Sequence, residues 1–185
     1  MKRIDMRFDE SIIRKWIGKK FVKYQCDAFD FTNSVTQIVG LFIADSVYKL
    51  TNIQRNVDYY GYMDDIAVCT IEGADESEIK SAFKETEQII TPVEGLITKI
   101  KIVNENQIVE SSSEIYDVWL TRAIIFEVDG REIMFEKDVV PFSEEIIIRR
   151  GYELMKKIAD EKTFLEGWDN GMNPKCVRKV IEINM

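Results

Sequence analysis

Apolar and polar residues alternate with a period of two along most of the chain, which is typical of strands that bury one face. Short runs rich in β-branched and aromatic residues, separated by Asn, Asp and Gly, occupy four segments before residue 75: 21–26, 35–43, 47–53 and 66–71. The alternation resumes at Leu96 and appears again over 176–183. We therefore expect a sheet whose strands are mostly antiparallel.

The clearest β-hairpin signal lies between residues 115 and 140. Asp129-Gly130 is a two-residue sequence of the kind that forms a type I′ turn. The strand pairs that such a turn creates are Val128 with Arg131, Phe126 with Ile133, and Ile124 with Phe135. This register collects apolar side chains on one face, whereas a slip of one residue would pair Phe126 with a glutamate, so the pattern favours the register given.

Helical spacing appears in four short segments, at 9–18, 75–87, 152–159 and 161–168. Asp75 and Glu78 have the spacing of a capping box at the start of the second segment. The sequence thus predicts an α+β fold: a mostly antiparallel, strongly curved sheet or partly open barrel with three or four short peripheral helices. The length of 185 residues suits one domain, 1–185, with possible lobes at 1–92 and 93–185. The residues expected in the core are Trp16, Ile38, Leu41, Tyr48, Leu50, Val68, Ile100, Ile124, Phe126, Ile133, Phe135 and Ile181.

Shifting the chain by 85 residues aligns one hairpin pattern with another. The shift places 35–52 over 120–137 without gaps, so that Leu41 meets Phe126. After a shortened loop, 64–68 falls over 144–148. Sequence identity is nearly absent and any two hairpins share alternation, so a structural duplication and a chance likeness of β modules both stay open. A duplication would give two lobes that meet across a groove.

The composition removes many enzyme classes. No histidine is present, which excludes Ser-His-Asp and Cys-His nucleophile systems and imidazole metal ligands. No glycine-rich phosphate loop, GxSxG, HExxH or EF-hand motif occurs, so we expect no cofactor. Three widely spaced cysteines, no export signal and no apolar run of membrane-spanning length favour a cytoplasmic, bacterial-type protein.

Charge is distributed unevenly along the chain. The net charge of −8 disfavours binding to nucleic acid or to anionic membranes. Residues 1–25 nevertheless carry eight Lys or Arg and three acids, a local charge of +5, so the remaining 160 residues carry −13. Such a split is explained either by a basic segment that lies on an acidic body or by an acidic face that meets a basic partner.

The acidic and aromatic segment 58–65 has the composition of a protein-binding surface. The residues expected to contact a partner are Asp58, Tyr59, Tyr60, Tyr62, Asp64 and Asp65, together with Trp168 and Asp169 from a second loop. Tyrosines supply a large contact area at low entropic cost, and aspartates complement Lys or Arg on a partner. In the alternative interpretation, the tyrosines cover the core, the aspartates cap turns, and 168–174 is a helix end followed by a turn.

The expected hairpin register also places Glu127 opposite Glu132. Facing carboxylates cost stability, and such a pair can bind a hard cation or share a proton. The alternative is a solvated outer face on which the two side chains splay apart.

The function expected first is a non-catalytic acidic binding protein that recognises and masks a basic protein partner, in the way that immunity proteins and inhibitors do. This is an analogy of charge and size. One alternative is a carboxylate-based divalent-metal hydrolase that uses Glu127 and Glu132. The other is a small-ligand-binding protein with a pocket between two lobes. The pattern of residues does not indicate an oligomeric state.

Overall fold

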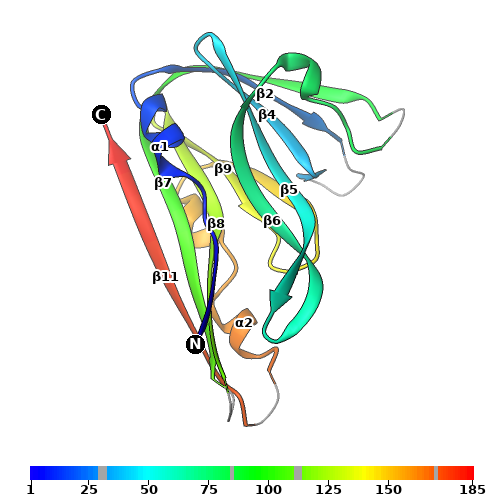
Figure 1. The fold of residues 1–185 in the computed structure, drawn as a ribbon. Coiled ribbons are helices and arrows are strands. Elements are labelled where there is room, and N and C mark those ends of the chain that lie inside the picture. The colour runs from blue at the N-terminus through cyan, green and yellow to red at the C-terminus, as the bar shows by residue number, and fades with distance from the viewer. Residues whose placement is uncertain (29–32, 84–85, 111–113, 169–170) are drawn as a thin grey trace.

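The structure is built around one open sheet of eleven strands, most of them antiparallel (Figure 1). It is a computed structural model that describes residues 1–28, 33–83, 86–110, 114–168 and 171–185. The path of hydrogen-bonded neighbours runs β3-β10-β9-β8-β7-β2-β4-β5-β6, with β1 added to β8 and β11 added to β7. The strands are β1 (Lys2–Met6), β2 (Lys20–Asp27), β3 (Ser34–Thr36), β4 (Ile38–Ile43), β5 (Ser46–Tyr59), β6 (Tyr62–Ala74), β7 (Gln88–Glu110), β8 (Ile115–Val128), β9 (Arg131–Lys137), β10 (Glu145–Gly151) and β11 (Asn173–Asn184).

Two long strands at the centre of the sheet change neighbours along their length. The first part of β7 pairs with β2 through residues 88–96, and the rest pairs with β8 and β11. The first part of β8 lies between β7 and the parallel strand β1, and the second part lies between β7 and β9. Strand β1 therefore pairs with the part of β8 that β9 does not reach, and β11 pairs with the part of β7 that β2 does not reach.

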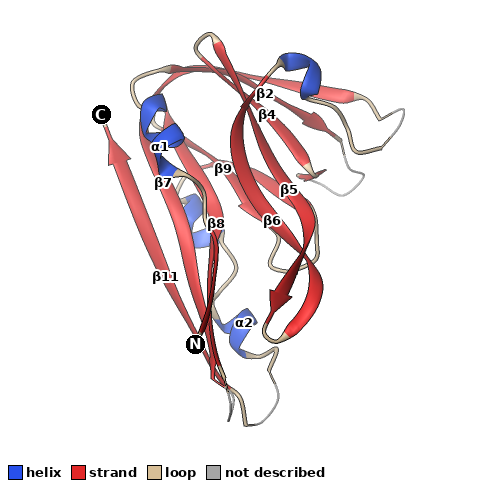
Figure 2. Cartoon of the chain, in the orientation of Figure 1, coloured by secondary structure: helices blue, strands red, loops and turns tan. Residues whose placement is uncertain are grey.

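Helix is a minor component, so the expected α+β class is wrong (Figure 2). Strand accounts for 64% of the structure and helix for 10%. The described residues form two α-helices, α1 (Glu10–Ile13) and α2 (Lys162–Leu165), and three 3₁₀ turns, η1 (Arg14–Trp16), η2 (Glu76–Glu78) and η3 (Leu154–Lys157). The sheet does not close into a barrel. None of the helices in the described parts of the chain is long and apolar enough to span a bilayer.

Segment 75–87 shows why the helix predicted from residue spacing did not form. Asp75 and Glu78 do form the capping box, but the helical turn ends at Glu78. Ile79 is already extended, at φ −80° and ψ 93°, and is only 4% exposed. Its side chain lies against Gly40, where a Cβ would approach Ile79 Cγ2 to 2.8 Å. Burying one such side chain stabilises by about 1.5–3 kcal/mol, whereas an isolated short helix is marginal in water, so the tertiary contact decides the conformation.

The sheet contains the same four-strand unit twice. The first repeat is β2, β4, β5 and β6, the second is β7, β8, β9 and β10, and β2 and β7 join them as antiparallel neighbours. Adding 76 to the residue numbers of β2 and 85 to those of β4 and β5 converts every β2–β4 and β4–β5 pair into a pair of the second repeat. Adding 77 to the numbers of β6 likewise generates all six β9–β10 pairs from β5–β6 pairs.

The irregular positions of the two repeats also coincide. β2 has a bulge between Phe21 and Lys23, and β7 has one at the equivalent place, between Ile97 and Lys99. Coincidence of both register and bulges favours duplication over a chance likeness of hairpins.

The register expected across the Asp129-Gly130 turn is confirmed, and so is the alignment of the two hairpins by 85 residues. The expected alignment of the last strands is wrong by three residues, because Ile146 corresponds to Cys69 and not to Ile66. The error arose in the connection before β10, whose length differs from that of the long β5–β6 hairpin.

One hydrophobic core joins both repeats. Trp16 is fully buried, and its ring centroid lies 4.7 Å from Tyr48 of the first repeat and 5.9 Å from Phe126 of the second. The aromatic contact between Phe21 and Phe126 also crosses the repeats, at 5.1 Å. Nine of the twelve expected core residues are buried; the partly exposed ones are Ile38, Tyr48 and Ile181.

Candidate functional site

The two repeats differ at the position just before β4 and at the equivalent position within β8. Gln37 and Asn52 of the first repeat correspond to Arg122 and Lys137 of the second by the same shift of 85 residues. In the first repeat, the connection between β9 and β10 closes this end of the sheet. Asn52 Nδ2 donates to two carbonyl oxygens of residues 143 and 145, each at 3.0 Å, and Gln37 Nε2 donates to the Glu144 carboxylate at 2.7 Å.

In the second repeat, the equivalent residues are cations with local acceptors. Arg122 is the residue that the β7–β8 register skips, since Val103 pairs with Ala123 and Asn104 pairs with Thr121. Arg122 Nη1 donates to the carbonyls of residues 137 and 138, at 3.2 and 2.9 Å. The Lys137 Nζ contacts the carbonyls of residues 138, 140 and 141 at 3.3–3.5 Å. These carbonyl acceptors belong to residues 137, 138, 140 and 141 of the same repeat, whereas in the first repeat the acceptors come from the other repeat.

The space at this end of the second repeat is a cavity of about 340 Å³, which we call the α2 cavity. Helix α2 lies between the lower ends of β8 and β6 in Figure 1 and forms one wall. Most of the lining is apolar and includes Met6, Ile66, Leu120, Val139, Phe164 and Trp168. Tyr59, Gln107, Arg122 and Lys137 supply the polar groups. Thr163 and Gly167 of the wall are exposed, so the cavity opens to solvent beside α2.

A buried ion cluster supports one side of the α2 cavity. Glu105 is 2% exposed and accepts hydrogen bonds from Arg122 Nη2 at 2.9 Å and from Arg178 Nη2 at 2.7 Å. Burial alone would raise the pKa of Glu105, but the two guanidinium groups outweigh it and hold the pKa below its usual range. One ionised carboxylate therefore serves two arginines.

Lys137 carries the other buried charge at this end. It is 5% exposed, and burial, reinforced by the nearby Arg122 charge, lowers the pKa of Lys137 to about 8. At pH 7 most of the lysine is still protonated. Within the described parts of the chain, no carboxylate oxygen lies within the 4.0 Å of an ion pair to its Nζ.

The tyrosines of segment 58–65 divide between the interior and the surface. Tyr59 lines the α2 cavity, and Tyr60 is 9% exposed in an aromatic cluster with Trp168, at 4.6 Å between ring centroids. Their hydroxyl groups donate to Gln107 Oε1 at 3.5 and 3.3 Å. Burial raises the pKa of both phenols, that of Tyr59 to about 12. Tyr62, by contrast, is 79% exposed.

The aspartates of this segment lie nearer the surface and accept local hydrogen bonds. Asp58 is ion-paired with Lys2 of β1. Asp65 accepts from Asn56 Nδ2 at 3.0 Å, and Asp64 accepts from the Asp65 amide at 2.8 Å. Asp64 and Asp65 are exposed and their other acceptor sites are available to a partner.

Only part of the second expected contact loop lies within the described residues. Trp168 is half-buried in the wall of the α2 cavity, whereas Asp169 lies outside the described residues. Binding of a basic partner through segment 58–65 and this loop stays a prediction.

The Glu127 and Glu132 pair faces across the hairpin as expected, but other groups engage both carboxylates. Glu132 accepts from Lys101 Nζ at 2.8 Å and from the Leu154 amide at 2.6 Å. Glu127 accepts from the Thr98 hydroxyl at 3.2 Å. The parts of the chain that the structure describes hold no group of three or more acidic or thiol side chains able to bind a metal ion.

The basic N-terminal segment lies on the acidic body. Four of its cations form ion pairs with acids beyond residue 25: Lys2 with Asp58, Arg3 with Asp117, Lys20 with Glu94, and Lys23 with Glu76. The internal explanation of the uneven charge is therefore supported.

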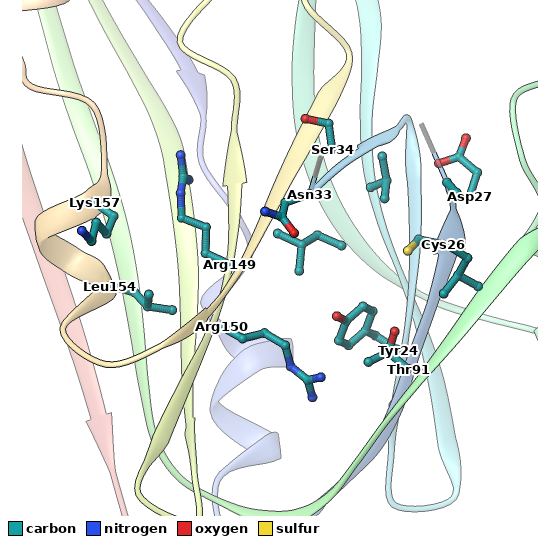
Figure 3. A pocket seen from close by; sticks show the side chains of 14 residues that line it. Tyr24, Cys26, Asp27, Asn33, Ser34, Thr91, Arg149, Arg150, Leu154 and Lys157 are labelled. Atoms are coloured by element: carbon teal, nitrogen blue, oxygen red, sulfur yellow. The ribbon is translucent and has the colours of Figure 1, made fainter. Parts of the chain in front are cut away.

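A second cavity, of about 600 Å³, is lined by residues of β2, β3, β7, β10 and η3, and we call it the β10 cavity (Figure 3). Arg149 is ion-paired with Glu136. Arg150 donates to the Pro92 carbonyl at 3.2 Å and lies 5.7 Å from the Tyr24 ring. The two arginines point in different directions in Figure 3, so they do not converge on one ligand position.

Arg122 and Lys137 were not among the expected site residues, although the sequence holds a signal for them. Lys137 continues the inward series Ile133 and Phe135, and Arg122 precedes Ile124 at the same spacing. A cation at a position that alternation assigns to the core is rarely left there without a partner.

In comparisons with known proteins, no protein-family model, no curated protein and no solved structure matched this chain. Function is therefore inferred from the geometry of the cavities.

Proposed function

We propose that the protein binds a small, mostly apolar molecule in the α2 cavity. The observation that carries this proposal is the difference between the two repeat ends. Asn52 and Gln37 close the end of the first repeat through hydrogen bonds to residues 143–145. The equivalent end of the second repeat holds a cavity of about 340 Å³.

The size and lining of the cavity support a small ligand. Ligand pockets typically have volumes of about 300–1,000 Å³, with mostly apolar walls and a few placed polar groups. The α2 cavity is at the lower end of this range, and aromatic rings of Phe164 and Trp168 line it beside the donors of Arg122 and Lys137. Protein interiors otherwise keep few voids larger than a water molecule.

The proposal is tested with N-phenyl-1-naphthylamine, an uncharged probe whose fluorescence increases in apolar surroundings. We expect fluorescence enhancement with the wild-type protein. Val139→Trp places a large ring in the cavity wall and is expected to weaken probe binding at least tenfold. The matched control is Val177→Trp, at a position on β11 that is 57% exposed, and it should bind the probe like the wild type.

Two results would overturn the proposal. One is the lack of any enhancement with folded wild-type protein. The other is equal weakening by both tryptophan variants, which would place the probe on the surface or in a partly unfolded state. Circular dichroism of each variant establishes that it is folded.

A further inference from the structure

The interior beside the α2 cavity has more positive than negative charge. The deeply buried groups there are Arg122 at 4% exposure, Glu105 at 2% and Lys137 at 5%. Arg178, whose side chain is 13% exposed, shares Glu105 with Arg122. Arg178 Nε also lies 3.9 Å from the Glu161 carboxylate, whose side chain is 38% exposed, so three cations face two carboxylates and both arginines are ion-paired. Buried charges in proteins are normally paired, because an uncompensated charge in a poorly solvated site is costly.

Lys137 is the cation without a counter-ion among the described residues. Its three carbonyl contacts, at 3.3–3.5 Å, are longer than the 2.7–3.2 Å of good N–H···O bonds. Charged groups face it from several elements: Arg122 on β8, Glu105 on β7 and Asp138 in the segment after β9, with the uncharged thiol of Cys69 on β6. Their combined effect leaves the lysine poorly stabilised in its charged form.

Arg122 has a free donor in the same lining. Its two Nη atoms are engaged by carbonyls and by Glu105, whereas the buried Nε has no hydrogen-bond partner among the described residues. Buried donors are nearly always satisfied by protein, water or ligand. Both the unpaired charge and the unpaired donor would be satisfied by one group with a negative charge and more than one acceptor atom.

We propose that the ligand of the α2 cavity is an organic anion, a carboxylate on an apolar body, with Lys137 as its counter-ion and Arg122 Nε as a further donor. This inference rests on the proposed function and names its ligand class. A carboxylate has two oxygens and accepts charge-assisted hydrogen bonds from Lys and Arg. The apolar walls contributed by Met6, Leu120 and Phe164 disfavour a bare inorganic anion, which would leave them without contacts.

The inference is tested by isothermal titration calorimetry with three probes that share one chain: octanoate, octan-1-ol and octylamine. We expect the wild-type protein to bind octanoate at least tenfold more tightly than octan-1-ol at pH 7, and octylamine least tightly. In Lys137→Met, which keeps the length of the side chain without its charge, the ratio between octanoate and octan-1-ol should fall to about one. Lys156→Met, at an exposed lysine, is the matched control and should keep the wild-type preference.

The pH dependence supplies a readout that a merely structural role would not move. Above pH 8 the unliganded lysine loses its proton, so the affinity for octanoate should fall as pH rises from 7 to 10. Affinity for octan-1-ol should not change over this range, and Lys137→Met should abolish the pH dependence for octanoate.

Each outcome separates this inference from the proposed function. Equal binding of octanoate and octan-1-ol by the wild type overturns the inference and leaves the proposed function standing. A preference for octanoate that persists in Lys137→Met removes Lys137 as the counter-ion and also overturns it. Failure of all three probes and of the naphthylamine probe overturns both.

Discussion

The two repeats pair their strands in one register, yet their equivalent ends have different chemistry. At the end of the first repeat, neutral Gln37 and Asn52 donate to the segment 143–145 of the other repeat. At the end of the second, Arg122 and Lys137 contact local carbonyls and border a cavity. Strand β3 of the first repeat pairs with β10, whereas the equivalent part of β8 pairs with β1.

This difference shows that the strand pairing maintains the fold, whereas the ends of the repeats are where a binding site can form. The shared register and bulges bury the same positions in both repeats, such as Leu41 and Phe126, and therefore belong to the core. The ends are not constrained by this pairing, so one end can be tied closed while the other keeps a pocket. Substitutions at equivalent positions can break or sharpen this comparison.

The largest effects are expected at the equivalent core positions. Leu41→Ala should lower the free energy of unfolding by about 2–5 kcal/mol and Phe126→Ala by about 3–5 kcal/mol, because each leaves a cavity among fully buried side chains. Both variants should unfold in a single urea transition, seen alike by circular dichroism and tryptophan fluorescence, since one core joins the repeats. Ile90→Ala, at a side chain that is 56% exposed, is the control and should cost less than about 1 kcal/mol. Two separate transitions would contradict a shared core.

Intermediate effects of opposite sign are expected at Lys137 and its equivalent, Asn52. Because the pKa of Lys137 is lowered to about 8 from its usual 10.5, the folded state disfavours the charged lysine below pH 8. This penalty fades as pH rises from 8 to 10.5, where the unfolded lysine also becomes neutral. Lys137→Met should therefore raise the free energy of unfolding at pH 7 by about 1–3 kcal/mol, and the gain should shrink at pH 10.

Asn52→Leu should instead lower the free energy of unfolding by about 1–3 kcal/mol at both pH values, because it removes the side-chain donor from the carbonyls of residues 143 and 145. Urea denaturation at pH 7 and pH 10 measures both variants. A loss of stability in Lys137→Met at pH 7 would show that the lysine is adequately paired and would remove the difference between the two ends.

The smallest effects are expected in the two hairpin turns, at 44–45 and 129–130. Ala44 and Asp129 both have a left-handed backbone, with φ of 50° and 48°, and Gly130 is also left-handed, with φ of 75°. Ala44→Gly should stabilise by about 0.5–1 kcal/mol, whereas Gly130→Ala should destabilise by about 1 kcal/mol. Thermal unfolding of both variants measures the difference. A loss of stability in Ala44→Gly would contradict the strain assigned to the left-handed backbone of Ala44.

The strands were largely predictable from the sequence because alternation and turn residues act locally. The Asp129-Gly130 hairpin follows from its turn and its apolar face alone. The segment after Asp75 was not predictable in this way. Ile79 is extended and contacts Gly40, which is distant in sequence.

The α2 cavity was even less accessible to sequence reasoning. Its walls come from several strands and connections together with one helix, and the bulge at Arg122 is a property of the β7–β8 pairing. Tyr59 and Tyr60 have the composition of an exposed binding loop, but the long β5–β6 hairpin folds them inward onto Gln107. Only the inward spacing of Lys137 after Phe135 and of Arg122 before Ile124 was visible along the chain.

The antiparallel seam between β2 and β7 has an evolutionary consequence. Within the seam, Lys20 pairs with Leu96, its equivalent by the shift of 76, and this local two-fold symmetry is the geometry of an isologous contact between identical subunits. A single ancestral four-strand unit with this edge would pair with its own copy, and both ends of that dimer would have to carry the same residues. Joining the two copies in one polypeptide removes this symmetry requirement. One end can then be closed by hydrogen bonds while the other holds a cavity.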